Sequence, residues 1–228
     1  MELNSENLSG LIDIDGADGI FTFENIESAC NTAQKLACRS VTVSPCYVNT
    51  CAKFLANTPE IIKKSLIGAP YGSDMTSVKV YAAKQAEIIG AQIIEAEMNI
   101  GAFLSGNTKY VKHELETLAG NLEVIFSAAI DADSMDVDQA AQAADLAASV
   151  TPFVKIRGTI DGTDCLFQKI DKAYELCKGC IQITAAVKGA GLDDIEKLKD
   201  IGVEYFALSA ADAEKLIGEA EAKPQDPV

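Results

Sequence analysis

The stretch PFVKIRGTIDGTDCLFQKIDKAYELCKGCIQITA, residues 152–185, contains the repeating unit that indicates the fold. An apolar segment at 152–156 is followed by an amphipathic segment at 163–178 and by a second apolar segment at 180–185. Gly179 stands just past the amphipathic segment, where glycine commonly ends a helix. This order predicts a strand, a helix and a second strand, which is the repeating unit of a parallel sheet.

The same alternation continues along the chain in both directions. The apolar segments that we expect to be strands are 11–14, 41–43, 64–68, 92–98, 122–127, 152–156, 180–185 and 203–208. Eight such repeats predict an α/β fold, a single-domain (β/α)8 TIM barrel over residues 1–222. A doubly wound open sheet is the alternative, but the GxGxxG fingerprint expected after its first strand is absent. The charged, proline-containing segment 223–228 is predicted to be a disordered tail.

The composition argues against several classes of partner. The 228 residues include 19 Lys and Arg against 34 Asp and Glu, a formal net charge of −15. Such an acidic chain is a poor ligand for nucleic acid or for an anionic membrane surface, because both require basic side chains. No apolar run approaches the ~18 residues that span a bilayer. We therefore expect a cytoplasmic protein that binds neither nucleic acid nor membrane.

The same reasoning bears on redox and metal chemistry. The seven cysteines, an odd number, are expected to be free thiols in a reducing compartment. The single histidine cannot build a histidine-based metal site. We expect no cofactor.

Lys155 is the most unusual residue of the apolar segments, because lysine is rarely buried without a partner. Alternation places it on the same face as Phe153. Active sites of barrels lie at the carboxyl ends of the strands, so an inward amine at this position would point into the barrel mouth. A lysine there could attack a carbonyl and form a Schiff base; the alternative is an interior lysine that is only salt-bridged.

Carboxylates also occur within predicted strands. Glu95 and Glu97 share one strand face, and Glu123 shares a face with Ser127. They indicate acid–base chemistry, a divalent-cation site, or a polar layer paired with the lysine. Asp13 and Asp15 are expected where the first strand ends at the barrel mouth.

Three segments carry a resemblance to a known family: IGAPYGSDMTSVKVYAAKQAEIIGA (67–91), NIGAFLSGN (99–107) and VTVSPCYV (41–48). They resemble the deoxyribose-phosphate aldolase family, which are class I aldolases with a TIM-barrel fold. The resemblance implies a lyase that cleaves or forms a C–C bond in a small aldehyde or phosphosugar, and it makes a homodimer a reasonable expectation.

The resemblance also implies roles for individual residues. Lys155 matches the lysine that forms the Schiff base, within a Phe-Val-Lys run. Glu95 stands where the family has an aspartate that relays protons, and Asp13 matches the aspartate of the first strand. Thr42 replaces a cysteine of the second strand and is expected to contribute to substrate binding. Gly158, Ser209 and Lys188 are expected to bind the anionic group of the substrate.

Several family positions are substituted in this chain. An ungapped match puts Thr184 at the position of the second active-site lysine, whereas a shortened loop would put Lys188 near it. Glu123 stands in place of a lysine of the fifth strand. Since a Schiff base needs a neutral amine, carboxylates near Lys155 would hinder it by raising the pKa of the amine. The alternatives are a catalytically impaired barrel that acts as a binding or regulatory module, and a carboxylate-based metal site.

Overall fold

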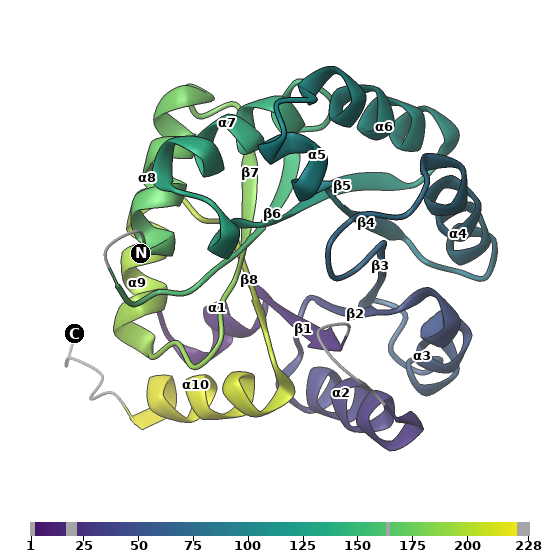
Figure 1. The fold of residues 1–228 in the computed structure, drawn as a ribbon. Helices are drawn as coiled ribbons and strands as arrows, with labels where there is room; N and C mark the ends of the chain where they lie inside the picture. The colour runs from purple at the N-terminus through teal and green to yellow at the C-terminus, as the bar shows by residue number, and fades with distance from the viewer. Residues whose placement is uncertain (1–2, 17–21, 163–164, 223–228) are drawn as a thin grey trace.

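The computed structural model describes residues 3–16, 22–162 and 165–222, and it contains a closed parallel barrel (Figure 1). The barrel order is β1 to β8, and β8 pairs with β1. The strands are β1 Ile12–Gly16, β2 Ser40–Val43, β3 Ile62–Ile67, β4 Ile93–Glu97, β5 Ile125–Asp131, β6 Phe153–Arg157, β7 Gln182–Ala186 and β8 Tyr205–Leu208. The prediction of a single-domain (β/α)8 barrel is confirmed.

Helices surround the barrel and follow the strands in turn (Figure 1). They are α1 Ser5–Ser9, α2 Phe23–Leu36, α3 Val48–Phe54, α4 Thr76–Ile88, α5 Ile100–Leu104, α6 Thr108–Asn121, α7 Val137–Ala148, α8 Leu166–Leu176, α9 Leu192–Ile201 and α10 Ala210–Ala222. Two 3-10 turns, η1 Pro45–Tyr47 and η2 Ala132–Ser134, follow β2 and β5. None of the helices in the described part of the chain is long and apolar enough to cross a membrane. The predicted tail 223–228 lies outside the described residues.

Local sequence signals explain where the helices begin. Thr22 caps α2, and Asn25 returns a side-chain bond to the Thr22 backbone. Asp136 and Gln139 form the same reciprocal pair at the start of α7. Each capping box satisfies backbone donors that the first helical turn leaves without partners.

Strand alternation divides the core into two layers. Val154 and Ile156 point outward, and they are buried in the apolar cluster between the strands and the helices. Burying each such side chain contributes roughly 1.5–3 kcal/mol. The alternate residues Lys155 and Arg157 point into the barrel, where they contact carboxylates of other strands. The inward orientation expected for Lys155 is therefore observed.

The fifth strand begins later than its sequence pattern predicts. Leu122 and Val124 are apolar and pack against the core, but they belong to the approach to β5 rather than to the strand. Glu123 is consequently exposed, and its backbone N–H donates to Oε1 of Glu87 at 2.6 Å. The predicted placement of Glu123 within the strand is wrong.

Candidate active site

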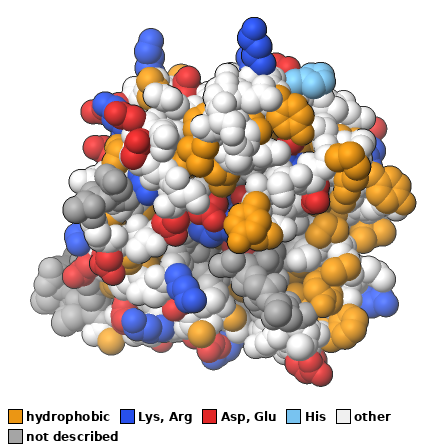
Figure 2. Space-filling view, in the orientation of Figure 1, with side chains coloured by type: hydrophobic (Ala, Val, Ile, Leu, Met, Phe, Trp, Pro, Cys, Tyr) orange, Lys and Arg blue, Asp and Glu red, His pale blue; other side chains and the backbone are white. Residues whose placement is uncertain are grey.

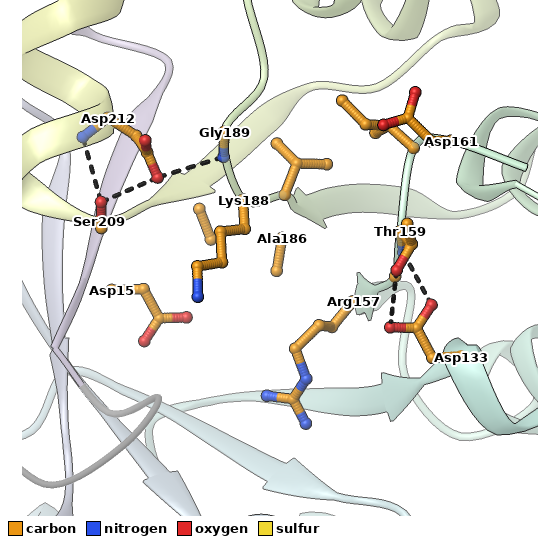
Figure 3. A pocket seen from close by; sticks show the side chains of 14 residues that line it. Asp15, Asp133, Arg157, Thr159, Asp161, Ala186, Lys188, Gly189, Ser209 and Asp212 are labelled. Atoms are coloured by element: carbon orange, nitrogen blue, oxygen red, sulfur yellow. Dashed lines mark hydrogen bonds between the residues drawn. The ribbon is translucent and has the colours of Figure 1, made fainter.

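A pocket of about 540 Å³ opens at the carboxyl ends of the strands (Figure 3). Asp15 of β1 lines it, together with the segments that follow β6, β7 and β8. Three residues that the sequence places in substrate binding are among its lining: Gly158, Lys188 and Ser209. Figure 3 shows the Lys188 side chain extending into the pocket toward Asp15.

Lys155 does not line this pocket itself, but it contacts Asp15, which does. Its Nζ donates to Oδ2 of Asp15 at 2.6 Å and to Oε2 of Glu95 at 3.1 Å, and only 2% of its side chain is exposed. Burial lowers the pKa of Lys155, but Asp15 and Glu95 outweigh burial and raise the pKa above its ordinary value. The amine is thus held as an ammonium that Asp15 separates from the pocket.

A charged network continues from Lys155 toward the opposite end of the barrel. Oε1 of Glu95 pairs with Nζ of Lys64 at 2.6 Å, and Lys64 donates to Oδ2 of Asp13 at 2.8 Å. Arg39 donates to both carboxylate oxygens of Asp13, at 2.8 and 3.0 Å. Opposite charges therefore alternate from Arg39 to Asp15, which offsets the cost of burying ions within the barrel.

Asp13 is the lower anchor of this network rather than a mouth residue. It is fully buried and also accepts a hydrogen bond from Oγ of Ser40 at 2.5 Å. Burial raises the pKa of Asp13, but Lys64 and Arg39 lower it to about 2. Of the two aspartates expected at the mouth, only Asp15 lines the pocket.

A second ion pair lies nearer the mouth. Nη2 of Arg157, a pocket residue, donates to Oε1 of Glu97 at 2.8 Å and to Oδ2 of Asp131 at 3.5 Å. Burial raises the pKa of Glu97 although Arg157 lies beside it. Glu95 and Glu97 are therefore both engaged by cations of the barrel itself.

Two threonines singled out by the sequence also lie inside the barrel. Thr42 is fully buried beside Asp15 in the sheet register, and its hydroxyl has no hydrogen-bond partner among the described residues. Thr184 is the register partner of Lys155 and lines a small cavity of 40 Å³ toward the opposite end. Neither residue lines the pocket at the mouth.

The carboxylates do not assemble a metal site in the described part of the chain. No group of three His, Cys, Asp or Glu side chains there could hold a metal ion. Glu123 is exposed beside Glu87 and precedes β5, whereas Glu95 and Glu97 lie on β4 inside the barrel. The hypothesis of a site built from Glu95, Glu97 and Glu123 is therefore wrong.

Comparisons with known proteins agree with this architecture. No family model matches the chain. A deoxyribose-phosphate aldolase of Klebsiella pneumoniae is 24% identical over 229 residues, which cover 99% of this chain and 92% of that protein. One of Caldicellulosiruptor saccharolyticus is 35% identical over 97 residues, 42% of this chain and 44% of the relative. Together these matches support a relationship to the deoxyribose-phosphate aldolase family.

A solved deoxyribose phosphate aldolase from Aeropyrum pernix superposes with a TM-score of 0.80 at 17% identity, covering 96% of this chain and 92% of that one. This structural likeness concerns the fold. Several other curated aldolases of the family match over less than half of their own length.

Three residues of the site were missed from the sequence, namely Lys64, Arg157 and Asp212, and Asp15 was expected at the mouth but given no role in the chemistry. For Asp15 and Arg157 a signal was available, since each lies two residues beyond a predicted site residue and therefore shares its strand face. Lys64 stands at the start of an apolar segment, where a lysine resembles a strand boundary. Asp212 lies in the first turn of a helix, where an acidic residue is ordinary.

Proposed function

We propose that this chain is a class I aldolase that makes or breaks a C–C bond in a small aldehyde or phosphosugar, with Lys155 as the Schiff-base lysine. One observation carries the proposal: the Lys155 amine lies 2.6 Å beneath Asp15, a carboxylate that lines the pocket. The similarity to deoxyribose-phosphate aldolases supports the same chemistry.

The first step is a proton transfer across that contact. Lys155 gives a proton to Asp15, and the neutral amine attacks the substrate carbonyl carbon to form a carbinolamine. Asp15 then returns the proton to the departing hydroxyl, which leaves as water, and an iminium ion remains on the lysine. The iminium withdraws electrons from the neighbouring carbon, where the C–C bond is made or broken.

Glu95 and Asp13 contribute to this proposal in different ways. Glu95 touches the reacting nitrogen, so it can share its proton and stabilise the iminium. Asp13 acts through Lys64, which it holds against Glu95, and it is a positioning residue. Thr42 lies at the level of Asp15, and its hydroxyl, which has no partner in the described part of the chain, can bind a water molecule beside that carboxylate.

The second candidate is a barrel that binds a ligand without catalysis. It is favoured by the raised pKa of Lys155 and by its two carboxylate partners. An unperturbed lysine is already less than ~0.1% neutral at pH 7, so the aldolase must displace or protonate Asp15 when substrate binds.

Reductive trapping distinguishes the two candidates. The protein is incubated with glyceraldehyde and sodium borohydride, and peptides are mapped by mass spectrometry. The aldolase proposal expects an adduct on Lys155 that is lost in Lys155→Met and retained in Lys188→Met. An adduct on Lys188 alone would reject Lys155 as nucleophile, and specific labelling of neither residue would favour the binding module.

We also infer that the protein is cytoplasmic. A separate inference is that two copies of the chain associate through the outer surface of α4. Hydrophobic side chains gather on one side of the molecule (Figure 2), and Tyr71, Met75, Tyr81 and Ile88 are each about two-thirds exposed. A related aldolase is described as tetrameric. Light scattering should give twice the monomer mass, and Tyr81→Glu should give a monomer; a wild-type monomer at micromolar concentration would reject the dimer.

A further inference from the structure

We infer that the pocket selects an uncharged hydroxyaldehyde and rejects a phosphorylated one. This inference rests on the proposed function and narrows its substrate class. Carboxylates of the chain itself accept hydrogen bonds from the donors that a phosphate would need. These contacts lie in the segments where the resemblance places the anionic group of the substrate.

Asp212, in the first turn of α10, makes the most informative contacts. Its Oδ2 accepts from the backbone N–H of Gly189 at 3.3 Å and from Oγ of Ser209 at 2.9 Å (Figure 3). Gly189 follows β7 and Ser209 follows β8, and both line the pocket. The carboxylate thus takes two donors from two different loops.

Asp133 occupies the opposite wall in the same way. Its Oδ1 accepts from the backbone N–H of Thr159 at 2.7 Å, and its Oδ2 accepts from the Thr159 hydroxyl at 3.1 Å (Figure 3). Thr159 follows Gly158 in the segment after β6. A backbone donor at each side of the pocket is therefore already satisfied by an anion.

A helix cap alone does not account for the position of Asp212. Ser209 and Asp212 do form a reciprocal pair at the start of α10, because the Asp212 N–H donates to Oγ of Ser209 at 3.1 Å. A cap would be complete with these two residues. The additional contact with Gly189 crosses to the loop after β7 and serves no helix terminus of α10.

The charged side chains that line the pocket also disfavour a phosphate. Asp15, Asp133, Asp161 and Asp212 line the pocket against Arg157 and Lys188. Arg157 is engaged by Glu97 and Asp131, and Lys188 extends toward Asp15. A phosphate would meet like charge from Asp133, Asp161 and Asp212, whereas hydroxyl groups of an uncharged substrate could donate to these carboxylates.

The test compares glyceraldehyde with glyceraldehyde 3-phosphate, which differ only in the phosphate. Wild type should react faster with the uncharged aldehyde and should show no calorimetric binding of inorganic phosphate at millimolar concentration. Asp212→Ala frees two donors and removes one charge, so the ratio of the rate constants for borohydride trapping on Lys155, phosphorylated over uncharged aldehyde, should rise about tenfold or more. Asp212→Asn keeps the acceptor oxygen without the charge, and its ratio should be intermediate.

Asp171→Ala removes an exposed carboxylate of α8 and is the matched control, with an unchanged ratio expected. Preference of the wild type for the phosphorylated aldehyde, tight phosphate binding by wild type, or an Asp212→Ala ratio within twofold of wild type would overturn the inference. If neither aldehyde can be trapped, the proposed aldolase function fails, and phosphate binding by Asp212→Ala against wild type still decides the inference.

Discussion

Replacing Asp13 by Asn tests whether this residue anchors the charged network or works at the pocket. The substitution keeps an oxygen that can accept from Ser40, but it removes the charge that holds Arg39 and Lys64. Glu95 remains as a partner for Lys64, and the Arg39 guanidinium still lies 3.7 Å from the centroid of the Tyr205 ring. The variant should therefore fold with reduced stability.

The magnitude follows from the pKa of Asp13, which falls from an ordinary 3.8 to about 2 in the folded protein. A lowered carboxyl pKa stabilises the fold above the unfolded value, and this contribution is lost as the pH falls through the folded value. The shift corresponds to about 2.5 kcal/mol at pH 6 and to about 1.3 kcal/mol at pH 3. The stability gap between wild type and Asp13→Asn should narrow by about 1 kcal/mol over this range.

Urea unfolding at pH 6 and pH 3 measures the gap, and Asp171→Asn is the control for loss of an exposed carboxylate. Trapping of an aldehyde on Lys155 should persist in Asp13→Asn at pH 7, because Asp13 does not reach the pocket. A gap that stays constant or widens at low pH would refute the electrostatic reasoning. Loss of trapping in a fully folded variant would show that Asp13 takes a direct part in the chemistry, and it would refute the claim that Asp13 only anchors the network.

Two further predictions concern packing and thiol reactivity. Gly72→Ala should destabilise the protein by about 2–4 kcal/mol, since an added Cβ would lie 2.2 Å from the Met98 carbonyl oxygen at a φ of +64°; Gly106→Ala, at a φ of +77° with open space around it, should cost only about 1 kcal/mol. Equal losses for the two variants in urea unfolding would contradict this account. Under native conditions the exposed thiols of Cys46 and Cys180 should react rapidly with a disulfide reagent. The buried thiols should react slowly, and fast labelling of them would contradict the packing around them; the buried cysteines are Cys30, Cys38, Cys51 and Cys177.

The barrel could be predicted from the sequence because each strand is a short apolar run bounded by helix signals. The inward lysine could be predicted as well, because Lys155 interrupts such a run and alternation fixes its face. The start of β5 could not, since Leu122 and Val124 continue the apolar pattern before the strand while packing as a loop.

The partners of Lys155 were harder to predict. Glu95 lies on another strand, and a polar layer joining it to the lysine was one of the alternatives. The catalytic role on the first strand was assigned to Asp13 rather than to Asp15, because the sequence alone does not show where β1 ends relative to the barrel mouth. Occupation of the pocket donors by Asp133 and Asp212 depends on loops meeting in space, which no local pattern reports.

The pH dependence of trapping at Lys155 tests the central claim most directly. In the proposed mechanism Lys155 passes its proton to Asp15 across their contact, so the neutral amine forms without loss of a proton to solvent and its population does not depend on pH between the pKa values of the pair. The rate of adduct formation on the Lys155 peptide should therefore stay nearly constant from pH 6 to pH 9. A rate that rises about tenfold per pH unit, or adducts confined to Lys188, would contradict the account.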